Sequence, residues 1–241
     1  MSYNIVKNVK AKRFLNNKFE DIEEKVIKEK YLDIYINNCR IQSIITIDED
    51  LEYLAYGSIF LGTKIEVDHI LNNIKISSNK CEIIYNDLDY NLKCCCQYEI
   101  ESSKKPLLSQ VETNIKPENI FKMYNILNEK SVIFKETAGL HGACIFDNDA
   151  NPIYFAKDIA RHNCISKIAG FLIKNKEKID DVKFIFLSCR VNNSIVKMIE
   201  RIGFSSILTK ATFSYQAIEY SIANNIKLIG FIRENRFTYF S

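Results

Sequence analysis

The amino-acid sequence predicts an α/β protein whose second half is a three-layer α/β/α domain. In residues 114–241, helix-like and strand-like segments follow one another in the order α-β-β-α-β-α-β-α-β. This order favours a mostly parallel sheet covered by helices on both faces. One segment, Val182–Leu187, is almost continuously apolar, which is typical of a strand inside a parallel sheet. In addition, clusters of polar residues follow the predicted strands, where the sites of such sheets gather.

Composition and charge limit the classes of protein to which the chain can belong. With 241 residues, 47% of them apolar, it can bury one sizeable core, or one domain and a small companion. The net charge is only +3 and no long basic run occurs, so we expect no nucleic-acid partner. No apolar stretch reaches the roughly 18 residues of a membrane span, and the first residues lack a signal-peptide core. We therefore expect a cytoplasmic protein without a membrane partner, with its eight cysteines reduced.

The first 92 residues divide into an arm and a small α+β domain. Residues 1–25 are polar and charged, and we expect them to form a loosely ordered arm. Residues 26–92 form the predicted small domain, in which Asn37-Asn38 suits a tight turn between two strands, Tyr31–Ile36 and Arg40–Ile45. Its other expected elements are a helix capped by Asp48 and short strands at Ile74–Ile76 and Glu82–Tyr85.

Three adjacent cysteines, Cys94, Cys95 and Cys96, stand in residues 93–113, which we expect to be a mobile loop. A buried strand hides one or two neighbouring cysteines but not three, because alternate side chains face opposite ways. An exposed thiol cluster suits sulfur or redox chemistry, since a thiolate has to reach its partner. Metal binding is least favoured, because no cysteine pair has the C-x-x-C spacing and adjacent side chains fit a tetrahedral site poorly. A purely structural origin stays open.

The elements of the second domain, residues 114–241, follow from local patterns. Pro117 suits the first turn of a helix that runs to about Lys130. Residues 147–152 are rich in turn formers and join two strands, Ala143–Phe146 and Ile153–Ala156. The later elements are a helix after Arg161, the strand Val182–Leu187, a helix from Asn192 or Asn193 that Gly203 ends, a strand at Ser206–Leu208, a helix at about Ser214–Ala223 and a strand at Ile226–Ile232.

The stretch from Asp158 to Lys167 carries most of the chemistry visible in the sequence. Asp158, Arg161, His162 and Asn163 stand between a predicted strand and the first turn of a predicted helix. Scaffolds present polar groups at such turns, and the amides of a helix N-terminus favour anions. The alternative is that Asp158 only caps the helix while Arg161 is solvated. From these residues alone, both interpretations stay open.

Further polar residues stand at the ends of other predicted strands. They are Thr137, Gly139 and His141 before the first strand of the second domain, and Ser188 and Arg190 after a later one. A lone histidine is most often structural, but His141 can also bind a ligand or transfer a proton. Together with Arg161 and His162, this set of imidazoles, guanidiniums and hydroxyls suits an anionic ligand such as a nucleotide phosphate.

Four motifs together resemble those of the FdhD family, which are sulfur carriers required for formate dehydrogenase activity. They keep the family's order and spacing: Thr137-Ala-Gly-Leu-His141, Asp158-Ile-Ala-Arg-His-Asn163, Ser188-Cys-Arg190 and Leu228-Ile-Gly-Phe-Ile-Arg233. The stretch Asp50-Leu-Glu-Tyr-Leu-Ala-Tyr-Gly57 is similar to the opening of that family. The resemblance covers about residues 25–241.

The resemblance implies a function. Members of the family take sulfur from a cysteine desulfurase as a cysteine persulfide. They deliver it to molybdenum (or tungsten) bis-molybdopterin guanine dinucleotide before this cofactor enters formate dehydrogenase. The implied partners are therefore a cysteine desulfurase, the formate dehydrogenase catalytic subunit, a GDP-like ligand and a second copy in a homodimer.

The resemblance also implies a fold and a set of site residues. The second domain is expected to be cytidine-deaminase-like, but without zinc, since no histidine is followed by x-Glu. The persulfide would form in the loop that carries Cys94, Cys95 and Cys96. The C-terminal residues expected to bind the cofactor, besides the motif residues named above, are Phe231, Ile232, Arg233, Glu234, Asn235 and Arg236.

The chain departs from the family pattern at several positions. Cys94-Cys95-Cys96 replaces a Cys-Gly-x-Cys-Gly motif, so the two-thiol relay has no residue-by-residue counterpart. Ala138 and Ala160 replace glycines, Ser166 replaces an aspartate and Cys189 replaces a glycine. A second hypothesis follows, in which the protein is a chaperone that holds the cofactor without passing sulfur.

Overall fold

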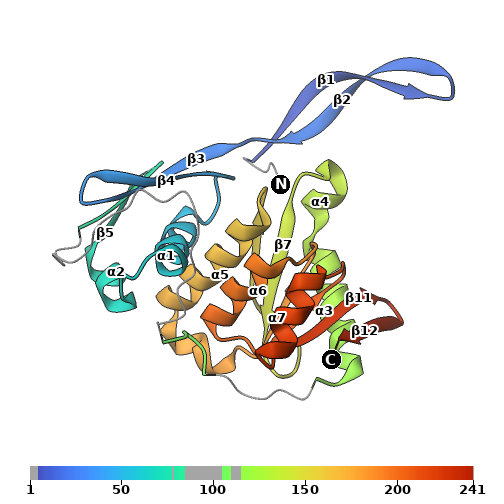
Figure 1. The fold of residues 1–241 in the computed structure, drawn as a ribbon. Helices are drawn as coiled ribbons and strands as arrows, with labels where there is room; N and C mark the ends of the chain where they lie inside the picture. Colours follow the sequence, from blue (N-terminus) through green and yellow to red (C-terminus); the bar gives the residue numbers. More distant parts are fainter. Residues whose placement is uncertain (1–4, 78, 85–104, 110–114, 241) are drawn as a thin grey trace.

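The computed structural model describes residues 5–77, 79–84, 105–109 and 115–240 (Figure 1). The three adjacent cysteines, Cys94, Cys95 and Cys96, lie outside the described residues. In chain order, the first half contains β1 (Val6–Leu15), β2 (Lys18–Ile27), β3 (Lys30–Ile36), β4 (Cys39–Thr46), α1 (Leu51–Gly62), α2 (Val67–Asn73), β5 (Ile74–Ser77) and β6 (Lys80–Ile83).

The second half is built on a six-stranded sheet with the order β12-β11-β10-β9-β7-β8. Its elements are α3 (Pro117–Lys130), α4 (Val132–Thr137), β7 (His141–Phe146), β8 (Pro152–Asp158), α5 (Arg161–Lys174), the 3-10 helix η1 (Lys176–Asp181), β9 (Phe184–Leu187), α6 (Asn193–Ile202), β10 (Ser206–Thr209), α7 (Tyr215–Ala223), β11 (Lys227–Arg233) and β12 (Arg236–Phe240). The predicted order of elements is confirmed, and α4, η1 and β12 are additions to it.

The expectation of a mostly parallel sheet is wrong. Only β9–β10 and β10–β11 pair in parallel, whereas β7 pairs antiparallel with both β8 and β9, and β12 with β11. The reason is that β7–β8 and β11–β12 are hairpins with short connections, and a short connection permits only antiparallel pairing.

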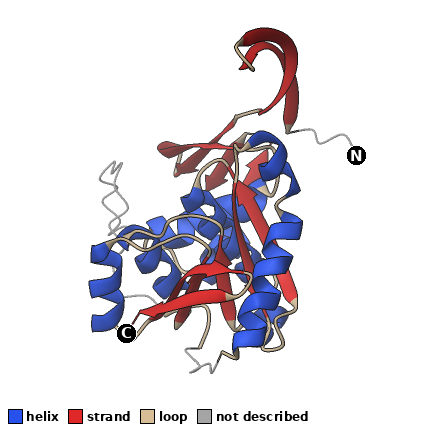
Figure 2. Cartoon of the chain, turned by 90° about the vertical axis from the view of Figure 1, so that its right-hand side faces the viewer, coloured by secondary structure: helices blue, strands red, loops and turns tan. Residues whose placement is uncertain are grey.

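Helices cover both faces of this sheet, as the three-layer prediction requires (Figures 1 and 2). On one face, Ile120, Met123 and Leu127 of α3 are buried against side chains that include Cys144 and Phe186. On the other face, α5, α6 and α7 bury apolar residues in one large cluster with alternate residues of β7, β9 and β10. The predicted α/β/α class of the second half is therefore confirmed.

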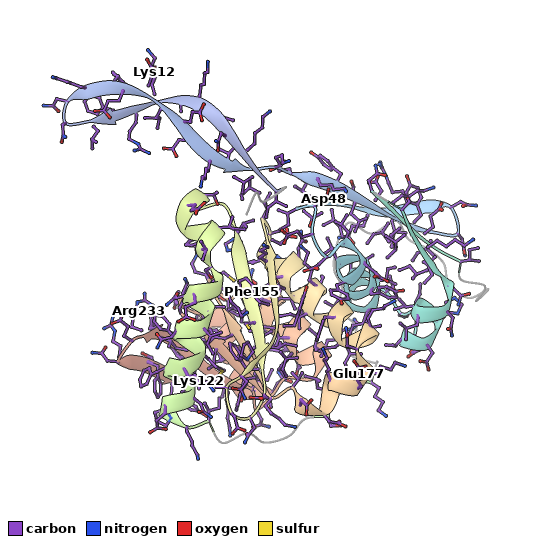
Figure 3. The ribbon with its side chains drawn as sticks, turned by 180° about the vertical axis from the view of Figure 1, so that it is seen from behind. Lys12, Asp48, Lys122, Phe155, Glu177 and Arg233 are labelled. Carbon is purple, nitrogen blue, oxygen red and sulfur yellow. The ribbon has the colours of Figure 1, made fainter. Side chains whose placement is uncertain are left out.

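The expectation that residues 1–25 are loosely ordered is wrong. Strands β1 and β2 pair along all ten residues of each strand and project from the body as a two-stranded ribbon (Figure 1). Asn16 and Asn17 form its turn with φ of 49° and 61°, the left-handed conformation that a two-residue hairpin loop requires. Its charges are paired across the strands, as Lys12 and Asp21 are at 3.8 Å. Lys12 lies well clear of the body (Figure 3).

The small four-stranded sheet of the first half has the order β4-β3-β6-β5. The predicted hairpin is confirmed, with Asn37 and Asn38 at its turn with φ of 49° and 64°. Asp48, however, does not cap α1, because the helix begins two residues later than expected and Asp50 precedes it. The carboxylate of Asp48 instead accepts a hydrogen bond from Lys30 at 2.6 Å.

The two halves are joined through a close helix crossing of α1 and α5. A Cβ at Gly57 would lie 1.7 Å from the carbonyl oxygen of Ser166, and a Cβ at Gly170 would lie 1.8 Å from that of Tyr53. Only glycine fits at such a distance. Residues Leu54 to Leu61 of α1 are all buried, because this helix is sandwiched between the small sheet and α5. None of the helices in the described ranges has the length and apolar character needed to cross a membrane.

Candidate functional site

The fold gathers the predicted polar residues at one edge of the six-stranded sheet. His141, the first residue of β7, pairs with Asp158, the last residue of β8. The loop after β9 comes to the same edge, because Ser188 exchanges two hydrogen bonds with Gly142. The amide of Ser188 donates to the Gly142 carbonyl and the amide of Gly142 donates to Ser188 Oγ, each at 2.8 Å. The carboxyl ends of β9, β10 and β11 therefore share this edge with the start of β7.

Two helix N-termini meet beside these strand ends. Arg161 and His162 form the first turn of α5, and Nε2 of His162 lies 2.9 Å from the hydroxyl of Ser194 in the first turn of α6. That hydroxyl donates to Oδ1 of Asn192, which caps α6 by accepting from the amide of Ile195. The positive ends of two helix dipoles at one place favour an anionic ligand.

Some buried polar atoms at this edge have no partner among the described residues. They are Nε of Arg161 and Oδ1 of Asn193. An unpaired buried donor or acceptor costs free energy, on the order of 1–3 kcal/mol. Arg161 as a residue is partly exposed, so a ligand at this edge can reach the guanidinium, although Nε itself is buried. The donor set therefore fits a phosphate-containing ligand.

The two histidines of the edge titrate below their ordinary range. Burial is the main cause that lowers the pKa of His141, and the guanidiniums of Arg161 and Arg190 lower it further, against the opposing carboxylate of Asp158. Burial and then Arg161 lower the pKa of His162. Both imidazoles are therefore neutral near pH 7, and each can donate one hydrogen bond and accept another. The positive charge of the edge is carried by the arginines.

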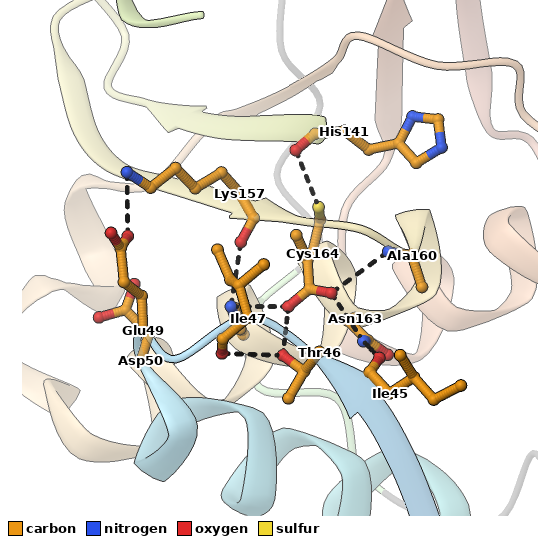
Figure 4. A network of polar contacts seen from close by, with 12 residues as sticks. Ile45, Thr46, Ile47, Glu49, Asp50, His141, Lys157, Ala160, Asn163 and Cys164 are labelled. Atoms are coloured by element: carbon orange, nitrogen blue, oxygen red, sulfur yellow. Dashed lines mark hydrogen bonds and ion pairs between the residues drawn. The ribbon is translucent and has the colours of Figure 1, made fainter. Parts of the chain in front are cut away.

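Beneath the edge lies a buried network centred on Asp158 (Figure 4). Its carboxylate is fully buried and pairs with Lys167 Nζ at 2.7 Å, and Lys167 is fully buried too. Oδ2 also accepts from the Thr46 hydroxyl at 2.5 Å, while Oδ1 accepts from the Asn163 side chain at 2.9 Å and from the Ala160 amide at 3.2 Å. These donors leave the carboxylate no surface with which to touch a ligand.

Three of the predicted ligand residues have side chains that are buried away from the edge. Asp158 and Asn163 are buried, and their polar atoms bond within the network rather than face the edge. Ile232 is also fully buried, in the apolar cluster under α3, because a bulge in β11 turns it inward. The interpretation of Asp158 as a structural residue at the helix start is closer to what the structure shows than a direct ligand role.

The remaining predicted residues lie at two places on the edge. Arg161, His162, His141, Ser188 and Arg190 are brought together as described above. Phe231, Arg233, Glu234, Asn235 and Arg236 lie at the β11–β12 turn (Arg233 is labelled in Figure 3) and are exposed. Because β10 separates β11 from β9, this turn lies at the end of the second strand from β9 and apart from the group around His141 and Arg161.

The loop before β7 is shaped by its last helical turn. The Thr137 hydroxyl donates to the carbonyl of Ile133 and accepts from the amide of Gly139, so its polar atoms end α4. Ala138 follows with φ of 50°, a left-handed conformation that strains an alanine. Beside this loop, a pocket opens next to His141, and its lining includes Ser131, Phe134, Phe155 and Ser188.

The thiols that the structure describes are poorly suited to sulfur transfer. Burial raises the pKa of Cys81 and Cys144 to about 12 and that of Cys189 to about 11, and it raises the pKa of Cys164 well above its ordinary value. Cys39 is exposed, but it begins β4 and so lies roughly 23 Å along the strand from Thr46. Within the described ranges no cluster of His, Cys, Asp or Glu could hold a metal ion.

Sequence reasoning missed several residues that organise the edge. Thr46, Asn193 and Ser194 were not predicted to belong to the site, and Lys167 was counted in the polar stretch but given no role. Lys167 is the one with a signal in the sequence, because a lysine on the apolar face of a predicted helix needs a buried partner. Thr46 gives no signal, since it lies 112 residues from Asp158 and only the fold brings them together.

Comparison with known proteins places the chain in a family. A model of the FdhD/NarQ family matches residues 27–241, so the chain belongs to the FdhD/NarQ family. Among its relatives, a protein named sulfur carrier protein FdhD from Listeria innocua is 28% identical over 98% of this chain and 97% of its own length. A protein named FdhD from Methanocaldococcus jannaschii is 32% identical over the same shares.

A solved structure confirms the fold. The crystal structure of a protein described as a formate dehydrogenase accessory protein from Desulfotalea psychrophila superposes with a TM-score of 0.81. The match covers 98% of this chain and 97% of the other, at 17% sequence identity. At this identity the likeness speaks for the fold alone.

Proposed function

We propose that this protein is a sulfur carrier that serves formate dehydrogenase. It would accept persulfide sulfur from a cysteine desulfurase and pass it to molybdenum (or tungsten) bis-molybdopterin guanine dinucleotide. The observation that supports the proposal is the sheet edge where the N-termini of α5 and α6 meet, because Arg161 in the first turn of α5 has a buried Nε without a partner among the described residues. Membership of the FdhD/NarQ family and the names of its relatives support the sulfur-carrier role.

At this edge the chain's own residues would bind and orient the guanine dinucleotide ends of the cofactor. Arg161 and Arg190 supply positive charge for phosphates, and charge-assisted hydrogen bonds of this kind are the strong ones. The neutral imidazole of His141 can donate to a phosphate oxygen without adding charge. The one N–H of neutral His162 is used on the Ser194 hydroxyl, which itself donates to Asn192. The exposed residues of the β11–β12 turn, among them Arg233 and Arg236, extend the surface for a ligand of this size. When bound, the metal supplies the centre that takes up the sulfur.

The sulfur would be carried by one of Cys94, Cys95 and Cys96. A thiolate there attacks the outer sulfur of the donor persulfide, a new S–S bond forms, and the donor cysteine leaves as a thiolate. Cys94 comes ten residues after Ile84 and fourteen before Leu108. The first connection can span at most about 33–36 Å, and the second about 46–50 Å. Leu108 is held at the C-terminal end of α6, because its amide donates to the Ile202 carbonyl. A loop of this length is compatible with delivery of sulfur to the edge.

A second candidate function is that of a cofactor chaperone that passes no sulfur. It is favoured by one observation, the replacement of the family's spaced cysteine pair by three adjacent cysteines. Under either function, we propose the formate dehydrogenase catalytic subunit and a second copy of this chain as partners. Nucleic acid and membranes are not among the proposed partners.

Intact-protein mass spectrometry separates the two functions. The protein is incubated with a cysteine desulfurase and cysteine, and the expected result is a gain of one sulfur atom. The gain should disappear with one of Cys94→Ala, Cys95→Ala or Cys96→Ala and persist with Cys39→Ala, the exposed control thiol. If the folded wild type gains no sulfur from an active desulfurase, the chaperone function is the better one.

A further inference from the structure

Six consecutive residues of the first half clasp the turn that carries Arg161 and His162. These residues, Ile45 to Asp50, comprise the last two residues of β4 and its connection to α1, and we call them the clamp (Figure 4). The Ile45 carbonyl accepts from Asn163 Nδ2 at 2.8 Å, and Glu49 pairs with Lys157 at 2.9 Å. The other two contacts are Thr46 Oγ1 to Asp158 at 2.5 Å and Asp50 to the Tyr154 hydroxyl at 2.8 Å.

The contact of Thr46 acts on the geometry of the turn through Asp158. Oδ1 of Asp158 receives the amide of Ala160 on one side of the turn and the side chain of Asn163 on the other. The position of this carboxylate therefore fixes where α5 begins. Among the described residues, Oδ2 accepts from two donors, Lys167 and Thr46. Thr46 is thus half of what holds that oxygen, and it comes from the other half of the chain.

Thr46 can be changed with less damage than its neighbours in the network. It is fully buried, so a substitution has to keep its shape. Valine replaces the hydroxyl by a methyl group of similar size and leaves the Asp158–Lys167 ion pair in place. Loss of Lys167 would instead leave a buried carboxylate without a charge partner.

We propose that Thr46 is a positioning residue for Arg161 and His162, and that the clamp holds the candidate site in its binding geometry. Apolar packing points the same way. Ile47 of the clamp is buried with Leu140, which precedes His141, and the partly buried Ile159 packs against them. The clamp thus contacts both the loop that precedes His141 and the turn that carries Arg161 and His162. This inference rests on the proposed function for its ligand, but not for its geometry.

The test compares Thr46→Val with Thr46→Ser, which keeps the hydroxyl. Thr63→Val is the matched control, because the Thr63 hydroxyl is also buried and donates to a helix carbonyl, that of Ile59 at 2.7 Å, outside the clamp. The first readout is the His162 pKa from an NMR titration of the imidazole resonances. The second is the dissociation constant for GDP from calorimetry, measured well below the unfolding temperature of every variant.

In Thr46→Val we expect the His162 pKa to rise towards the ordinary value of about 6.5, because the loosened turn becomes more hydrated. We expect GDP to bind roughly tenfold more weakly. In Thr46→Ser, the His162 pKa and the GDP affinity should both stay close to the wild-type values. Thr63→Val should change neither of them, although it lowers the free energy of unfolding. If Thr46→Val does not fold, Glu49→Gln loosens the same clamp at a partly exposed pair and should give smaller shifts in the same directions.

A His162 pKa that is unchanged in a folded clamp variant, or equally changed in Thr63→Val, would overturn the positioning role. Wild-type protein that fails to bind GDP would count against the proposed cofactor instead. The His162 titration still decides the role of Thr46 in that case, because it needs no ligand.

Discussion

Arg161 is the residue on which ligand binding at the edge depends most directly. Arg161→Ala should weaken GDP binding about 10- to 100-fold, because it removes charge-assisted hydrogen bonds worth roughly 1.5–3 kcal/mol. Arg161→Lys should recover only part of the affinity, since an ammonium cannot replace a planar fork of donors. Calorimetry with GDP measures both variants. Arg13→Ala on the arm removes the same charge away from the edge, and an equal loss there would mean that GDP binds through net charge alone.

The left-handed backbone conformation of Ala138 lowers the free energy of unfolding. Its φ of 50° is left-handed, and it is exposed, so its methyl group adds little packing. Ala138→Gly should therefore raise the free energy of unfolding by about 1 kcal/mol, which corresponds to a rise in Tm of roughly 2–4 °C.

The matched control for this prediction is Ala160→Gly. Ala160 has φ of −103°, a conformation that alanine adopts without strain. Glycine there only adds freedom to the unfolded chain, so the Tm should fall. Equal effects of the two substitutions in thermal unfolding would contradict the assignment of strain to Ala138.

At the scale of elements, the junction of β8 and α5 depends on a buried ion pair. Lys167→Met should lower the free energy of unfolding by about 3–5 kcal/mol, because it leaves the Asp158 carboxylate buried without its charge partner. Lys174→Met on the same helix should cost less than about 1 kcal/mol, since the Lys174–Glu52 pair is partly solvated. Urea denaturation compares the two, and similar losses would show that the buried pair is not the source of the effect.

Elements with a local signal could be predicted from the sequence, and those that depend on distant contacts could not. Asn37-Asn38, Pro117 and Gly203 mark a turn, a helix start and a helix end through their own backbone preferences, and all three are confirmed. The arm was missed because half of the positions in its strands are charged and the strands stabilise each other by pairing. The Arg161–His162 turn was found through its residue types, whereas Thr46 was not, because a buried hydroxyl looks like any strand threonine.

At the scale of the whole molecule, the lowered pKa values of His141 and His162 link stability to pH. A histidine with a pKa below its unfolded value of about 6.5 binds fewer protons when folded. The free energy of unfolding should therefore fall as the pH drops below about 6.5, level off once it is below the folded pKa values, and show no such dependence above 6.5. Urea denaturation between pH 5 and 8 measures this dependence.

The double variant His141→Gln, His162→Gln provides the control for this effect. Glutamine keeps hydrogen-bonding capacity but does not titrate in this range, so the part of the slope due to the two imidazoles should vanish. A slope that persists unchanged would assign the pH dependence to other groups. The affinity for GDP should change in the opposite direction and rise as the pH falls below about 6.5, because an anion favours the charged imidazoles. Binding in that range should therefore take up protons.

The glycine contact between α1 and α5 restricts how the protein can move during its work. With Gly57 and Gly170 at backbone distance from the facing helix, the two halves cannot rotate or slide past one another without breaking a packed interface. The described body is therefore expected to act as one rigid frame, without a hinge between its two halves.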